Sequence, residues 1–387
     1  MTPIRITGGQ VLLATDGFVA TDISLRDGRI DAIGSHDSGR GGKGLTIDAS
    51  DLLVLPGIID IHGDAFERQV QPRPGVAFPM GIALRDTERQ LLANGITTAY
   101  LGVTLSWEPG LRSLDSWNAL LAALHEESRT CDMRVHLRWE AYNLDALDSA
   151  LADIASGRVH LLAFNDHTPA IMKKLKDPVE GAKYSGRAGM TMSAFTAFTD
   201  RIASRASEVP AAQERIGAAA RAAGLPMCSH DDESVAVRTR FRALGAHICE
   251  FPVAEEAGRD ARAQGEHVVM GSPNVVRGRS HLNWATAAVM AEAGVCDILS
   301  SDYYYPAMAR AAFVLMDRGV FDLPRAWAMI SANPAAAAGL TDRGTIEVGK
   351  RADVVLVEPA ARRLVATIAG GKLAHLTAEG AGRLTVS

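Results

Sequence analysis

Both ends of the chain alternate apolar and polar positions around glycine and aspartate turns. Residues 23–30 read Ile-Ser-Leu-Arg-Asp-Gly-Arg-Ile, and residues 344–357 show the same texture. A period of two predicts half-buried β-strands and hairpins. Each end alone has too few strands for independent stability. We therefore expect residues 1–52 and 343–387 to form one composite β domain, a small β-sandwich.

Between residues 53 and 342, short apolar runs alternate with alanine-rich segments. Strands are expected near residues 54–62, 97–103, 133–140, 159–166, 226–230, 246–251, 267–271 and 297–302. Alanine favours helices, as in residues 211–223 and 282–293. Alternating strands and helices predict βα units around a parallel sheet. The predicted fold class is α/β, a TIM-like (β/α)8 barrel with about eight strands.

The interval from residue 167 to residue 198 has no clear strand and is rich in Lys, Gly and Ser. A connection of that length inside a compact domain is usually functional. It is therefore expected to be a loop or lid over the site.

Composition narrows the classes of partner. The chain has 387 residues and a formal net charge of −5, which argues against general nucleic-acid binding, because a polyanion usually requires a clustered basic surface. Its most apolar stretch, residues 52–61, is interrupted by Asp60, which argues against a membrane span or export signal. The four cysteines form no CxxC pattern and suit free thiols in the cytoplasm. We expect a small anionic substrate and a homo-oligomer, with neither nucleic acid nor membrane as partner.

Metal-binding residue types recur where the expected strands end. The first strand ends in a His and an Asp two positions apart, and side chains at i and i+2 of an extended chain point the same way. Later strands also end in histidines or acids. The candidate ligands are His62, Asp64, Glu140, His167, His230 and Asp302. Functional groups of barrel enzymes gather at the carboxyl ends of the strands, so these side chains are expected to converge.

Histidines and carboxylates without cysteine suit zinc or another divalent first-row metal. The candidate ligands exceed what one ion needs, so we expect a binuclear site. Such ions lower the pKa of bound water to about 7 and stabilise charge on the attacked group. Asp302 is the candidate general base, although it could serve only as a ligand.

A second candidate lies in residues 270–281, a glycine-punctuated segment with arginines, serines and a histidine. Such groups suit phosphate oxygens, whereas the alternative is a solvated turn. The expected substrate-binding residues are Asn274, Arg277, Ser280, His281, Arg73 and Lys183. Four histidines away from the strand ends are expected to be core or bottom-face residues: His136, His160, His247 and His267.

The sequence resembles those of the amidohydrolase superfamily. That resemblance rests on residues 55–62, on the strand-terminal His167, His230 and Asp302, and on the closing residues 344–353. A narrower resemblance, to the PhnM-like family of phosphonate metabolism, covers almost the whole expected barrel. It rests on residues 72–74, 94–98, 136–140, 166–169, 229–232, 250–252, 270–280 and 299–304.

The narrower resemblance implies hydrolysis of alpha-D-ribose 1-methylphosphonate 5-triphosphate to the 5-phosphate and pyrophosphate. Two positions depart from the superfamily pattern: Asp64 replaces the second histidine of His-x-His, a change that PhnM-like sequences share, and Glu250 stands where many members have a histidine. One alternative function is an amidohydrolase acting on an amide or lactone. Another is a non-catalytic scaffold, against which the nearly complete ligand set argues.

Overall fold

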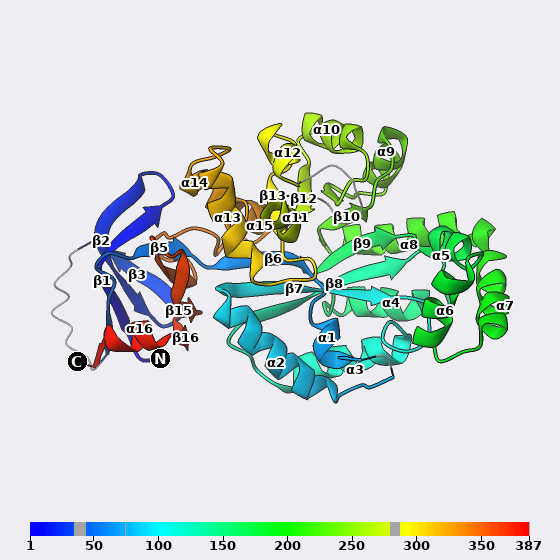
Figure 1. The fold of residues 1–387 in the computed structure, drawn as a ribbon, viewed down its shortest axis with the longest axis horizontal. Coiled ribbons are helices and arrows are strands. Elements are labelled where there is room, and N and C mark those ends of the chain that lie inside the picture. The colour runs from blue at the N-terminus through cyan, green and yellow to red at the C-terminus, as the bar shows by residue number, and fades with distance from the viewer. Residues whose placement is uncertain (35–43, 74, 279–286, 387) are drawn as a thin grey trace.

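The computed structural model describes residues 1–34, 44–73, 75–278 and 287–386, and its centre is a barrel of parallel strands (Figure 1). Within these residues, eight strands follow one another around the barrel in chain order. They are β6 (Ile58–Gly63), β7 (Ile96–Leu105), β8 (Asp132–Glu140), β9 (Leu161–Asn165), β10 (Met227–His230), β11 (Ile248–Glu250), β12 (His267–Gly271) and β13 (Ile298–Ser300). The predicted barrel is confirmed.

The barrel is nearly closed between its first and last strands. The Asp64 amide donates to the Asp302 carbonyl at 2.9 Å, and the Asp302 amide donates to the His62 carbonyl at 3.0 Å. The seam therefore joins three of the predicted site residues through their backbones. β7 shows why the strands read as apolar runs: all ten of its residues are buried, as expected for a parallel strand covered on both faces.

Helices surround the barrel. They are α1 (Glu67–Val70), α2 (Met80–Ala93), α3 (Leu114–Glu126), α4 (Leu147–Ala155), α5 (Thr168–Lys174), α6 (Pro178–Arg187), α7 (Met192–Ala203), α8 (Val209–Ala222), α9 (Val235–Ala243), α10 (Glu255–Ala263), α11 (Ser272–Arg277), α12 (Ala287–Glu292), α13 (Ala307–Asp317), α14 (Leu323–Ala328) and α15 (Ala332–Ala337). The expected helix over residues 211–223 is observed as α8, and that over 282–293 is described only from Ala287.

Residues 167–198 do not form the expected loop, because α5, α6 and α7 fill most of this interval, and the expected role as a lid stays a prediction. They lie at the right of Figure 1, beyond β9. Two of them begin at side-chain caps: Asp177 accepts hydrogen bonds from the amides of Val179 and Glu180, and Thr191 accepts from Ala194. Pro178 at the first helical position strengthens the start of α6.

The two ends of the chain share a second, mostly antiparallel sheet, at the left of Figure 1. Its described strands are β1 (Ile4–Leu13), β2 (Gly17–Arg26), β3 (Arg29–Ile33), β4 (Leu45–Asp48), β5 (Leu53–Pro56), β14 (Val354–Glu358), β15 (Arg363–Ala369), β16 (Lys372–Leu376) and β17 (Leu384–Val386), with α16 (Ala378–Gly382) before the last. The sheet forks at β1, which pairs with β2, β4 and β5. β5 belongs to this sheet. The N-terminal part of the β domain therefore extends to Pro56, whereas the sequence predicted its end at residue 52.

The four cysteines, Cys131, Cys228, Cys249 and Cys296, are free and buried, as the sequence predicts. Within the described part of the chain, no helix has the length and apolar character needed to cross a membrane.

Candidate active site

The backbone is strained just beyond the carboxyl ends of three barrel strands. Asp231 follows β10, Phe251 follows β11 and Asp302 follows β13, and their φ angles are 58°, 49° and 55°. Non-glycine residues rarely adopt this left-handed conformation, and it is often found where function requires it. Three of the six non-glycine residues with positive φ in the described part of the chain therefore lie at this end of the barrel.

The three predicted ligand histidines converge at this end. The rings of His62 and His230 lie 5.4 Å apart, and those of His167 and His230 lie 6.0 Å apart. Phe251 packs against His62 and His230, with ring separations of 4.8 and 5.3 Å. Residues from four different strand ends thus share one small space, although His62 and Phe251 are 189 positions apart in the sequence.

Glu140 and His167 form one pair. Nδ1 of His167 contacts a carboxylate oxygen of Glu140, whose other oxygen accepts from the His167 amide at 3.1 Å. Burial lowers the pKa of this imidazole, but the Glu140 charge and a contact with Asp231 outweigh it and raise the pKa of His167 to about 9. The pair places one imidazole and one carboxylate at the rim, with Asp231 3.8 Å from Nε2 of His167.

Glu250, whose participation the sequence left open, lies beneath His62. Its Oε2 is 3.2 Å from Nδ1 of His62 and its side chain is fully buried. A carboxylate accepts, so Nδ1 carries the hydrogen and Nε2 of His62 is left as the ligand atom. A carboxylate that orients a ligand histidine in this way is common in metal sites.

His136 is fully buried in the core, as expected, and its Nδ1 lies 3.1 Å from the Ile61 carbonyl oxygen, but it also lies close to the candidate ligands. Its ring lies 5.1 Å from that of His62, and its Nε2 lies 3.7 Å from Oε2 of Glu250. The reason is that β8 points alternate side chains inward, which places His136 below Glu140 inside the barrel. By contrast, His160 and His267 lie at the amino end of the barrel. There His160 accepts a hydrogen bond from the Val135 amide, and His267 contacts the Asp297 carboxylate.

Asp64 and Asp302 complete the predicted ligand set beside the seam. Oδ2 of Asp64 lies 3.5 Å from Nη1 of Arg138, whose Nη2 lies 3.3 Å from Nε2 of His230. Burial, followed by the Asp64 charge, raises the pKa of Asp302 to about 7. A carboxyl group with such a pKa can both accept and return a proton near neutral pH.

Asp60 is a site residue that the sequence reasoning missed. It is fully buried in β6 and accepts from the Ser301 amide at 3.0 Å, from the Ser301 hydroxyl at 2.5 Å and from the His62 amide at 3.3 Å. It thereby ties β6 to β13 beside Asp302. The available signal was a charged residue in the middle of an otherwise apolar strand.

The donor set suits a metal ion. Two groups at the rim bring ligand atoms within 4.8 Å of one another: His62, His230 and Glu250, and His167, His230 and Asp231. A deeper group combines His136, Cys228 and Glu250. Among the described residues, Nε2 of His136 and Oε1 of Glu250 are buried without a hydrogen-bond partner. Because buried polar atoms are nearly always satisfied, these orphaned atoms fit a divalent cation.

The predicted substrate-binding residues are scattered. Asn274 is buried in α11, where its Oδ1 has no partner among the described residues. Arg277 is exposed and donates to the Tyr303 hydroxyl at 3.2 Å. Arg73 is exposed, and Lys183 is exposed in α6 and paired with Glu180. Ser280 and His281 lie outside the described residues.

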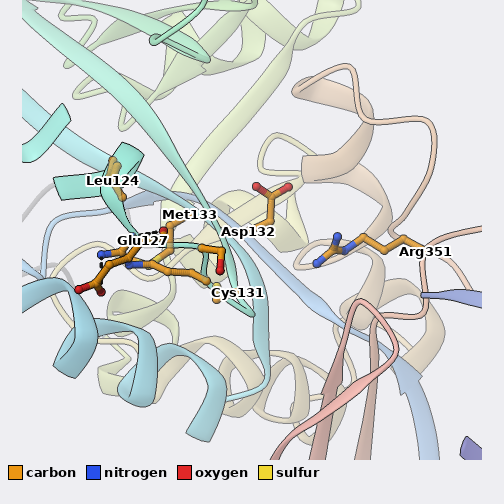
Figure 2. Close-up of a pocket in the computed structure, with 8 residues that line it drawn as sticks. Leu124, Glu127, Cys131, Asp132, Met133 and Arg351 are labelled. Atoms are coloured by element: carbon orange, nitrogen blue, oxygen red, sulfur yellow. Dashed lines mark hydrogen bonds and ion pairs between the residues drawn. The ribbon is translucent and has the colours of Figure 1, made fainter. Parts of the chain in front are cut away.

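A hollow of about 410 Å³ lies at the opposite end of the barrel, where β8 begins (Figure 2). Figure 2 shows Asp132 and Arg351 facing one another across it. Its charged side chains already have partners: Asp132 pairs with Arg343, and Arg351 with Asp353. This hollow therefore offers a bound molecule little uncompensated charge.

Residues 53–378 match the amidohydrolase family. The chain therefore belongs to the amidohydrolase family and is a hydrolase, which confirms the predicted membership. It is 31% identical over 320 residues to the alpha-D-ribose 1-methylphosphonate 5-triphosphate diphosphatase of Escherichia coli strain K12, covering 80% of this chain and 84% of that protein.

Solved structures share the fold at low identity. An amidohydrolase from a Sargasso Sea environmental sample is 18% identical, with a TM-score of 0.64 over 97% of this chain and 93% of that one. A beta-aspartyl dipeptidase of Fervidobacterium islandicum AW-1, in complex with a beta-Asp-Leu dipeptide, is 13% identical, with a TM-score of 0.65 over 97% and 96%. At such identities the likeness speaks for the fold alone.

Proposed function

We propose that the protein is a metal-dependent diphosphatase that hydrolyses a ribose 5-triphosphate, alpha-D-ribose 1-methylphosphonate 5-triphosphate, to the 5-phosphate and pyrophosphate. The observation that carries the proposal is the convergence of His62, His167 and His230 with acids at one rim. The similarity to the Escherichia coli diphosphatase supports the choice of substrate.

In the proposed reaction, water forms a new bond to phosphorus as the bond between phosphorus and the α,β-bridging oxygen breaks. Pyrophosphate leaves and the 5-phosphate remains on the ribose. Asp302 accepts the proton of the attacking water, a role for which its pKa of about 7 is suited. The expected binuclear zinc centre would draw on His62, Asp64, Glu140, His167, His230 and Asp302. Divalent cations there would polarise a phosphoryl oxygen and lower the pKa of water.

The surrounding residues hold these groups in place. Glu250 fixes the ring of His62, and Asp60 fixes the backbone between His62 and Ser301. Phe251 packs against the histidine rings and covers one side of the site. The expected anionic substrate is small, and a cytoplasmic, homo-oligomeric enzyme without nucleic-acid or membrane partners remains part of the proposal.

The test is a substrate panel. Purified protein is assayed for pyrophosphate release from ribose-based triphosphates, beside hydrolysis of N-acyl amino acids and lactones. We expect pyrophosphate release that stops on dialysis against a chelator and returns with zinc. Turnover of amides or lactones without pyrophosphate release would replace the proposal with the amidohydrolase alternative. Absence of any turnover in the zinc-loaded protein would favour a scaffold.

A further inference from the structure

Arg138 is a cationic side chain that reaches into the middle of the candidate site, and the sequence reasoning gave it no role. His136, Arg138 and Glu140 occupy alternate positions of β8 and so share its inward face. The guanidinium of Arg138 lies between Asp64 at 3.5 Å and His230 at 3.3 Å. Arg138 is only 6% exposed, whereas the cationic residues predicted for the substrate are exposed.

The neighbouring strand leaves room for this side chain. A Cβ atom at Gly102 of β7 would lie 3.4 Å from Cδ of Arg138 and 3.7 Å from Nε2 of His62. Both distances are ordinary van der Waals contacts, so Gly102 lies directly beside Arg138 and His62, and a side chain longer than that of alanine would extend into the space between them.

Arg138 uses few of its donors within the protein. Its Nε is buried without a hydrogen-bond partner among the described residues, and its ion pair with Asp64 is long. Arg238, also buried, shows what a structural arginine looks like here: it donates to Ser229, to Asp232 and to backbone carbonyls, and it pairs with Glu266. Burying a charge with so few hydrogen-bond partners destabilises the fold unless a bound group supplies the missing partners.

The charge of Arg138 acts directly on the ligand residues. Burial has the largest effect on the pKa of His62 and of Asp64, lowering the first and raising the second. The Arg138 charge comes next and lowers both. A planar guanidinium fork in this place suits the oxygens of a phosphoryl group.

We propose that Arg138 is a catalytic residue that contacts the phosphoryl oxygens of the substrate and of the pyrophosphate product beside Asp64 and His230. The inference rests on the proposed function and deepens it, because it names the residue that recognises the reacting phosphates. The cationic contact thus comes from the barrel wall, while Arg277, Arg73 and Lys183 lie outside this inner space.

The test compares Arg138→Met and Arg138→Lys with Arg134→Met in the zinc-loaded, full-length protein. Arg134 is a matched control, because it lies on the same strand face at the other end of the barrel, paired with Asp132. Three quantities are measured: zinc content by mass spectrometry, pyrophosphate affinity by titration calorimetry, and turnover of the ribose triphosphate. Thermal melting verifies that each variant is folded.

We expect Arg138→Met to retain its zinc and to bind pyrophosphate about 10- to 100-fold more weakly. Arg138→Lys should recover part of that loss, because it keeps the charge but not the fork, and Arg134→Met should match the wild type. Unchanged affinity in Arg138→Met, no pyrophosphate binding by the wild type, or zinc loss from both Arg138 variants would overturn the proposal. A wild type that binds pyrophosphate through Arg138 but releases none from the triphosphate would refute the proposed function and leave the contact standing.

Discussion

Both ends of the barrel carry buried or half-buried charges, but the two ends treat them differently. At the amino end, Asp297 accepts from Arg262, from His267 and from the Val268 amide, all at 2.8 Å. Arg343 likewise donates to Asp132 at 2.6 Å and to Thr98 at 2.9 Å. These charges find partners among their neighbours.

At the carboxyl end, by contrast, several buried polar atoms lack partners and the backbone is strained. Nε2 of His136 and Nε of Arg138 have no hydrogen-bond partner among the described residues. Asp302 adopts a left-handed φ angle and its pKa is raised to about 7. Unsatisfied polar atoms and backbone strain destabilise a fold. They are typical of functional sites, where a bound ligand supplies the missing partners. The contrast separates the functional end from the structural end without reference to any relative.

The strongest test of this contrast uses the two acids that flank β13. Asp302→Asn removes the proposed proton acceptor while nearly preserving shape, so turnover of the triphosphate should fall about 10²- to 10⁴-fold. Metal content should change less. Asp297→Asn, at the other end of the strand, should lower the melting temperature and leave turnover close to that of the wild type. Similar turnover losses in both variants would show that the two ends do not divide function from structure.

Metal affinity gives the next largest effect. Glu250→Gln removes the charge that orients His62, so zinc affinity should fall roughly 10- to 100-fold, as for other outer partners of metal ligands. Competition with a chelating dye measures it. Glu266→Gln is the control, because Glu266 is also a buried acid but pairs with Arg238 and Arg242 at the amino end. If the two variants bind zinc equally well, Glu250 does not orient the ligand.

The strands and most site residues could be predicted because each strand is a short apolar run that ends in a polar residue. The first boundary could not be predicted in this way. The apolar run from Leu52 to Ile61 is continuous, yet β5 belongs to the terminal sheet and β6 to the barrel. Gly57 separates them, and a Cβ there would lie 2.4 Å from the Thr97 hydroxyl. Such a close approach depends on a distant strand and leaves no local pattern.

Other misses have different causes. The helix α6 was hidden by its polar composition, although the capping residue Asp177 was a visible signal, and Thr191 was the corresponding signal for α7. Arg138 and Asp60 were missed because they lie within strands rather than at their ends. In a closed barrel the inward positions of a strand also line the site, and register decides which of them reach the rim.

Substrate selectivity gives a smaller effect. Arg277 is exposed and near the rim through its bond to Tyr303. If it holds the distal phosphates, Arg277→Ala should raise KM for a triphosphate severalfold, since a hydrogen bond to an ionised group contributes about 1.5–3 kcal/mol before solvent screening. The KM for a neutral amide or lactone should change little. Steady-state kinetics on both substrate types decides, and equal effects on the two would remove Arg277 from phosphate binding.

The smallest expected effect concerns stability at the amino end. Burial raises the pKa of Asp132, but Arg134 and Arg343 outweigh it and hold the pKa below its usual 3.8. A depressed carboxyl pKa contributes stability that is present above the unfolded-state pKa and is lost as pH falls through the folded-state pKa. Asp132→Asn should therefore cost about 1–2 kcal/mol of unfolding free energy at pH 7. The gap between variant and wild type should narrow below pH ~4, near the unfolded-state pKa.

Urea unfolding at pH 7, 5 and 3.5 measures that gap, and triphosphate turnover at pH 7 measures function. We expect turnover to stay near the wild-type value, because Asp132 begins β8 whereas Glu140 and Arg138 lie toward its carboxyl end. A gap that is constant with pH would mean that the Asp132 charge contributes nothing through Arg134 and Arg343. A large loss of turnover would mean that the amino end of this strand shapes the site at its other end, and the division between the two ends would fail.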